Sequence, residues 1–201
     1  MQTHTYTVTT YDFDELSDKA KAKARDSLRD VNVDDSYWSE YILEDAKECA
    51  KIIGIDIDNI YFSGFSSQGD GACFTGRWLY KKHSAKDIRI HAPDDTQLHK
   101  IADALQAAAK PHFYQLEARV SLSGQYYHEY CTSVDVEDSD NWHRDPSEDT
   151  HDAVTFALRE FMRWIYKRLE NEYWDLQSDE QVTETIEANE CQFTESGEFY
   201  A

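Results

Sequence analysis

The chain has 201 residues, and its 40 Asp and Glu against 20 Lys and Arg give a formal net charge of −20. Such a chain repels phosphate, which argues against direct nucleic-acid binding, and no apolar run approaches the roughly 20 residues that a membrane-spanning helix needs. The first ten residues, MQTHTYTVTT, lack the basic start and apolar core of a secretory signal, so we expect a cytoplasmic protein without membrane contact.

The aromatic content indicates a folded domain. There are 13 Tyr, 9 Phe and 5 Trp but only 7 Gly and 3 Pro, which predicts an aromatic-rich core. The four cysteines are far apart in sequence and match no zinc motif, so we expect buried, reduced thiols and no bound metal or cofactor. They are Cys49, Cys73, Cys131 and Cys191.

Hydrophobic periodicity predicts the elements of the first half of the chain. In chain order these are a strand at Thr5–Phe13, a helix at DELSDKAKAKARDSLRD, a helix at Ser36–Ile53, and a hairpin of Ile57–Phe65 and Ala72–Tyr80. Asp14 or Ser17 can cap the first helix, and Gly54 can end the second in a left-handed conformation. The first helix also carries the largest basic cluster of the chain, which is Lys19, Lys21, Lys23, Arg25 and Arg29.

The second half is predicted in the same way. It begins with a short edge strand at Ile88–His91, a helix capped by Asp94 or Asp95 and ended by Pro111, and a hairpin of Tyr114–Ser123 and Tyr126–Val136. An acidic stretch follows, then a long helix at Thr150–Leu176, and then a short helix to Ala188 with Ser178 and Gln181 as a capping box.

This order predicts an α+β fold. We expect one antiparallel sheet built from two hairpins plus the N-terminal strand, with helices packed on one side and a long C-terminal helix. The expected segments are an α+β core at 1–138, an acidic linker at 139–150 and a helical segment at 151–201 packed on the core as part of one domain.

The loop SGFSSQGDG is the most distinctive segment. Gly69 and Gly71 flank Asp70 and allow a tight turn, but an apolar β-pattern follows in place of a helix, and Asp70 would repel phosphate. We therefore expect a structural turn that can also contact a partner, with Gln68 and Asp70 as the candidate contacts.

No enzyme motif is present. The stretch DVEDSDNWHRD resembles the start of a calcium loop, but Trp142 and His143 stand where the pattern requires a ligand and a glycine. No nucleophile elbow exists, since Ser63-Gly-Phe-Ser66 does not match it. A metal-dependent hydrolase built from Asp70, His128 and the Asp135–Asp140 carboxylates stays open as an alternative, although we expect no catalysis.

Four segments together resemble uncharacterised proteins encoded by tailed bacteriophages and prophages. They are FDELSDKAKAKAR, YFSGFSSQGDGACFTG, RIHAPDDTQLHKIADAL and FMRWIYKRLENEYWDLQSDEQVTETIEANECQFTESGEFY, of which SQGDGA and EANE…F are the most specific. The resemblance implies expression in the cytoplasm of a bacterial host. By analogy, small acidic phage proteins often inhibit host defence, as anti-restriction proteins and anti-CRISPRs do, but no functional residue is implied.

Uneven charge completes the functional hypothesis. Carboxylates crowd the linker and the last third of the chain, where they can imitate the phosphates of a polynucleotide. We expect a non-enzymatic inhibitor that occupies the basic groove of a host nucleic-acid-binding complex, such as a CRISPR effector. The candidate contacts, besides Gln68 and Asp70, are Asp135, Glu137, Asp138, Asp140, Asp145, Glu148, Asp149, Glu170, Glu172 and Asp175.

A second hypothesis is an antitoxin-like or regulatory module that binds its partner through a hydrophobic interface. Exposed aromatic side chains would serve it, and the candidates are Trp142, Trp174 and Tyr200.

Overall fold

The structure is a computed structural model that describes residues 2–4, 7–139 and 146–200. The chain divides into two compact units. Unit 1 consists of Met1–Ser39 and Asn171–Ala201, and unit 2 consists of Glu40–Glu170. This division differs from the predicted segments, because the two ends of the chain meet in unit 1.

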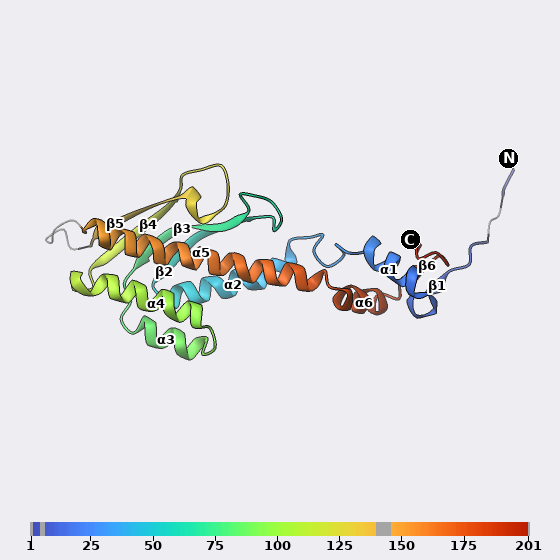
Figure 1. Cartoon of the computed structure of the whole chain (residues 1–201), viewed down its shortest axis with the longest axis horizontal. Coiled ribbons are helices and arrows are strands. Elements are labelled where there is room, and N and C mark those ends of the chain that lie inside the picture. Colours follow the sequence, from blue (N-terminus) through green and yellow to red (C-terminus); the bar gives the residue numbers. More distant parts are fainter. Residues whose placement is uncertain (1, 5–6, 140–145, 201) are drawn as a thin grey trace. The chain divides into compact units, whose positions relative to one another are not determined.

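Unit 2 contains a four-stranded antiparallel sheet (Figure 1). Its strands, β2 (Ile55–Ser63), β3 (Gly71–Leu79), β4 (Leu116–Leu122) and β5 (Thr132–Asp138), lie in sequence order. The register sets Trp78 between Ile55 of β2 and Ala118 of β4, so a branched and a small side chain flank the indole. Both predicted hairpins are confirmed, and the antiparallel α+β class with them.

Helices cover one face of this sheet. They are α2 (Tyr37–Ile52), α3 (Ser84–His91), α4 (Thr96–Ala109) and most of α5 (Glu148–Leu176). On the covered face, Phe74 meets Phe161 of α5 edge-on, with ring centroids 6.0 Å apart. Trp78 is fully buried there, and its indole N–H donates to the carbonyl of Ile53 at 3.2 Å. Alternate residues, such as Arg119 and Asp135, point to the open face and are exposed.

Unit 1 has a small core of its own. It holds β1 (Tyr11–Asp12), the 3-10 turn η1 (Phe13–Glu15), α1 (Asp18–Ser27), α6 (Asp179–Ala188), β6 (Gln192–Phe193) and β7 (Phe199–Tyr200). The three short strands pair in the order β1-β6-β7. The apolar stripes of α1 and α6 close over Phe13 and Phe193, and the buried cluster is Phe13, Leu16, Ala20, Ala24, Val182, Ile186 and Phe193.

The N-terminal strand is shorter than the predicted Thr5–Phe13 and belongs to a different sheet. Only Tyr11–Asp12 forms a strand, and it pairs with β6 of unit 1 and not with the large sheet. Residues 7–10 are β-formers by composition, yet they lie in no strand. The physical reason is that β-propensity measures the fit to a pleated, half-buried surface, and these side chains are largely exposed.

One further strand prediction is wrong, and another strand begins later than predicted. Ile88–His91 belongs to α3, where Ala85 and Ile88 are buried one turn apart; four residues are too few to separate helix from strand by period. The predicted strand Tyr126–Val136 begins only at Thr132, after the 3-10 turn η3 (Glu129–Cys131). The aromatic residues before Thr132 do not pair in the sheet. They stack on neighbouring rings instead; Tyr127, for example, stacks on Tyr61 with ring centroids 5.3 Å apart.

The helix predictions are confirmed, and so are their capping residues. Ser17 accepts from the amide of Ala20, Asp95 from that of Leu98, and Ser178 from that of Gln181. The side chain of Gln181 donates to Glu184, so the bond back to the cap that a full capping box requires is not made. A 3-10 turn, η2 (Lys110–His112), follows α4 at Pro111.

The aromatic core consists of Phe and Trp, not Tyr. Phe74, Trp78, Phe161 and Phe193 are fully buried, whereas none of the tyrosines that the structure describes is. A phenol keeps its hydroxyl in water while its ring packs on a neighbour, so the tyrosines line surfaces. Among the described residues, no helix has the length and apolar character needed to cross a membrane.

Gly54 ends α2 as predicted, with φ at +87°. A Cβ at this position would lie 2.2 Å from the carbonyl oxygen of Leu79. Gly69 in the hairpin loop also has positive φ, at +102°, but a Cβ there would meet nothing closer than 3.8 Å.

This contrast gives a matched test of packing at the α2–β2 junction. We expect Gly54→Ala to destabilise the protein by clearly more than Gly69→Ala, whose cost should stay near the roughly 1 kcal/mol of left-handed strain. Urea unfolding followed by circular dichroism measures both free energies. Equal losses would mean that the backbone at Gly54 relaxes without cost.

Candidate functional site

The anionic part of unit 1 is built by α6 and the residues that follow it. Unit 1 contains 17 Asp and Glu and only five Lys and Arg, of which Lys19, Lys21, Lys23 and Arg25 lie on α1 and Arg29 lies just after it. Four of them are in ion pairs with carboxylates of the same unit. Lys23 reaches Glu198 at 2.8 Å, while Arg25 and Arg29 reach Asp179 at 3.4 and 2.6 Å.

Two carboxylates of this network show its electrostatic effect. The hydrogen bond from Arg29 lowers the pKa of Asp179 below its ordinary value. The hydrogen bond from Lys23 lowers the pKa of Glu198 in the same way. The basic cluster seen in the sequence is therefore engaged internally, and the remaining carboxylates of unit 1 set the sign of its surface.

A hollow of about 690 Å³ opens in this anionic surface. Four carboxylates line it, from Asp12, Asp14, Glu187 and Glu190, and no Lys or Arg is among the described residues of its wall. Apolar atoms of Phe13 and Ile186 complete the wall. We call this feature the acidic hollow; its geometry suits the end of a Lys or Arg side chain from a partner protein.

Sequence reasoning missed the residues of the acidic hollow. They come from two segments about 175 residues apart, and the only available signal was the EANE segment, which contains Glu187 and Glu190. The pairing of β1 with β6 brings them together, with Asp12 opposite Gln192.

The predicted contacts on β5 lie on the open face of the large sheet. Asp135 stands opposite Arg119 in the register, and Glu137 stands opposite Glu117, which is bound by Arg77. Asp135 and Glu137 are exposed, but their neighbours include both signs of charge. This face is therefore not a purely anionic strip.

Asp138 corrects the predicted contact set. Its side chain is only 4% exposed and lies 3.9 Å from the ring of His112, so a partner cannot reach it without a rearrangement. The strand alternation places this carboxylate on the same face as the buried Val134 and Val136. Two other predicted contacts, Asp140 and Asp145, lie outside the described residues, as does Trp142.

The predicted contacts on α5 fall into two groups. Glu148 and Asp149 are exposed in its first turn, where they stabilise the helix dipole. The acidic linker is accordingly shorter than predicted, because the helix begins at Glu148. Further along, Glu170 pairs with Lys167 at 2.7 Å, Glu172 is half-buried, and Asp175 is exposed.

The two predicted partner contacts in the β2–β3 hairpin loop, Gln68 and Asp70, have different surroundings. Gln68 is exposed at the tip, but the carboxylate of Asp70 turns back and accepts from the amides of Ser66 and Ser67 at 3.0 and 2.6 Å. Asp70 therefore holds the turn closed, and its role as a partner contact stays a prediction. The turn itself is confirmed.

The proposed hydrolase residues do not assemble. His128 lies in the loop before β5, where its Nδ1 accepts from the amide of Tyr130 and its Nε2 is 3.3 Å from Sγ of Cys131. Among the described residues, Asp70, His128 and Asp135 form no group that could hold a metal ion.

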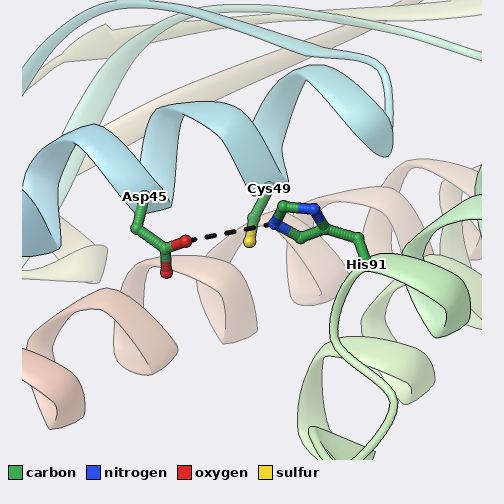
Figure 2. A group of neighbouring side chains, drawn as sticks. All are labelled: Asp45, Cys49 and His91. Carbon is green, nitrogen blue, oxygen red and sulfur yellow. Dashed lines mark ion pairs between the residues drawn. The ribbon is translucent and has the colours of Figure 1, made fainter.

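A different cluster has the donor types of a metal site. Asp45 and Cys49 lie one turn apart on α2 and face His91 at the end of α3 (Figure 2). Their nearest donor atoms all lie within 4.8 Å of one another, with 4.0 Å between Asp45 Oδ1 and His91 Nε2. Carboxylate, thiolate and imidazole are ligands that zinc accepts.

The surroundings of this cluster oppose metal binding. Arg168 donates to Asp45 Oδ2 at 2.5 Å, so the carboxylate is already neutralised. Burial, with a smaller contribution from the charge of Asp45, raises the pKa of the Cys49 thiol to about 12, whereas a metal needs the thiolate. We interpret the cluster as a structural contact among α2, α3 and α5.

The chain belongs to a family defined by a domain of unknown function, DUF8835, whose model matches residues 38–179. The match spans all of unit 2, while the residues of the acidic hollow lie outside it. No curated protein and no solved structure matches the chain.

Thiol labelling tests the burial of Cys49. At neutral pH we expect iodoacetamide to modify Cys191, which is half-buried, well before Cys49 or Cys73, because only thiolates react and burial raises the pKa of the latter two to about 12 and about 11. Peptide mass spectrometry at successive times gives the rates. Comparable labelling of all four cysteines in urea is the control, and rapid native labelling of Cys49 would contradict the packing of α2 against α3.

Replacing Asp179 tests the ion pairs of unit 1. Its lowered pKa stabilises the folded state above the unfolded value near 4, and this contribution is lost as pH falls through the lower folded value. We expect Asp179→Asn to cost less than about 1 kcal/mol at neutral pH, because the pair is exposed, and the difference from wild type to vanish in acid. Thermal unfolding across pH measures this.

The control is Glu180→Gln, which removes an exposed carboxylate from the same turn of α6. A loss at neutral pH as large as that of Asp179→Asn would show that net charge, and not the pairing with Arg29, sets the effect.

Proposed function

We propose that this member of the DUF8835 family is a non-enzymatic binding protein whose anionic unit 1 docks on a Lys- and Arg-lined surface of a nucleic-acid-handling protein. One observation carries the proposal: the acidic hollow gathers four carboxylates around apolar atoms, with no cation among its described lining residues. A hollow of this composition offers a guanidinium both ion pairs and a surface on which to pack.

The charge of unit 1 supports this partner chemistry. Because the cations of α1 pair internally, exposed carboxylates dominate the rest of the surface. Such an excess produces potentials of several kT that reach about 8 Å into physiological buffer. These potentials steer the protein toward basic clefts, and clefts that hold nucleic acid are lined by Lys and Arg.

The phage resemblance adds a setting to the proposal. In a bacterial host, the partner would be a defence complex that binds nucleic acid, such as a CRISPR effector, and occupation of its basic groove would exclude the nucleic acid. The acidic surface then acts as a competitor for that groove and needs no catalytic residue.

A second candidate function is that of a regulatory module that binds its partner through a hydrophobic interface, and exposed aromatic side chains favour it. Trp174 and Tyr200 of unit 1 are 50% and 48% exposed. Large apolar side chains so exposed are frequent at protein interfaces. The two candidates differ in which substitutions abolish binding.

A charge-neutralising variant tests the acidic hollow. We expect Asp14→Asn, Glu187→Gln and Glu190→Gln together to lower capture of the partner from bacterial lysate by about tenfold or more, because close interfacial charge pairs each contribute about 1.5 kcal/mol or more. Quantitative mass spectrometry after affinity capture, at rising salt, is the measurement. Wild-type capture should weaken steadily with salt.

The matched control is Glu40→Gln, Glu44→Gln and Asp58→Asn, which removes the same charge from exposed positions of unit 2. It should retain capture. If the hollow variant binds as well as wild type while Trp174→Ala does not, the hydrophobic module is the correct reading and the electrostatic proposal fails.

A further inference from the structure

Unit 2 contains a second hollow, of opposite charge to the first. It has a volume of about 780 Å³ and lies between the end of β3, α3, α4 and the residues before β4. Pockets for small molecules typically occupy about 300–1,000 Å³. We call it the basic hollow, because Lys82, Lys86 and Arg89 line it. It shares no residue with the acidic hollow.

The cations of the basic hollow are available to a ligand. Arg89 already bridges Asp103, at 2.6 Å, and the carbonyl of Ala85, at 2.5 Å, which fixes its guanidinium at the wall. Lys82 and Lys86 are exposed and make no ion pair within the part of the chain that the structure describes. Because both lysines and Arg89 line one hollow of an otherwise acidic chain, this wall favours an anionic ligand.

A tyrosine pair supplies a flat surface in the same hollow. The rings of Tyr80 and Tyr114 are stacked with centroids 4.5 Å apart and an interplanar angle of 28°. Tyr80 is the more buried ring, while Tyr114 is 40% exposed. The exposed ring can therefore stack on a planar group of a ligand, as aromatic residues do on nucleobases.

The backbone holds Tyr114 in place at an energetic cost. Phe113 and Tyr114 both have positive φ, at 53° and 64°, and His83 on the wall has φ of 70°. Non-glycine residues in this conformation cost of the order of 1–3 kcal/mol each and concentrate at binding sites. Glycine would suit the backbone at position 114 better, but it would lack the ring, which packs one side on Tyr80 and is itself 40% exposed.

We propose that the basic hollow binds a free nucleotide. Lys82 and Lys86 would hold the phosphate groups, and the exposed ring of Tyr114 would stack on the base. A mononucleotide is favoured over a polynucleotide because the phosphates of a long strand would leave the hollow and meet the carboxylates of an otherwise acidic protein. This proposal rests on unit 2 alone and does not depend on the acidic hollow.

Calorimetric titration of the full chain with ADP tests the proposal. We expect one ADP per chain, bound more weakly as salt rises, and about tenfold or more weaker binding to the variant Lys82→Gln, Lys86→Gln. The control is Lys100→Gln, an exposed lysine of α4 that does not line the hollow, and it should bind ADP as wild type does.

The variant Tyr114→Gly separates a binding role from a structural one. Glycine accepts the left-handed backbone, so thermal unfolding should show stability equal to or above that of wild type, while ADP binding weakens about fivefold or more. Inorganic pyrophosphate, which has no ring, should bind less tightly than ADP and should not respond to Tyr114→Gly.

Three results would overturn the proposal. They are no ADP binding to wild type at low salt, ADP binding that is unchanged by Lys82→Gln, Lys86→Gln, and tighter binding of an oligothymidylate than of ADP. The last result would make the hollow a site for single-stranded nucleic acid.

Discussion

Uncompensated negative charge is the physical constraint on which the rest of this structure depends. With 17 carboxylates and five cations, unit 1 must hold like charges together in a small volume. Two interactions make that feasible. Phe13 and Phe193 anchor a buried core with α1 and α6, and cations of α1 bridge to carboxylates from the other end of the chain, as Lys23 does to Glu198. Because those cations are consumed, the surface left over is anionic, and the acidic hollow is a consequence of this arrangement.

Unit 2 has a smaller excess of negative charge than unit 1. It contains 23 carboxylates and 15 cations, and its ion pairs include Arg77 with Glu117 and Arg168 with Asp45. What distinguishes Lys82 and Lys86 from the other lysines of this unit is that they line one hollow together with an aromatic pair and strained residues. The two hollows thus attract ligands of opposite charge, a cationic protein surface and a small anion, and each proposal can fail without the other.

The cluster of Asp45, Cys49 and His91 shows why donor types alone do not define a metal site. Proximity is satisfied, but the carboxylate is already bound by Arg168, and the buried thiol resists ionisation. The stacking of Arg168 on the ring of Trp164, at 4.9 Å, fixes the guanidinium in this role. The chemistry around a cluster, more than its geometry, decides between a structural contact and a ligand set.

Local interactions explain what the sequence by itself determined. Helix periods, capping residues such as Ser17 and Asp95, the tight turn at Gly69 and the two hairpins all depend on neighbours within a few residues, so they could be predicted, as could the excess of charge. Tertiary structure alone decided that β1 pairs with β6, that Asp138 lies against His112, and that Lys82 and Tyr114 line the same hollow. Those outcomes depend on which distant residues pack together. Several packings compete, and their relative free energies cannot be read from a single sequence.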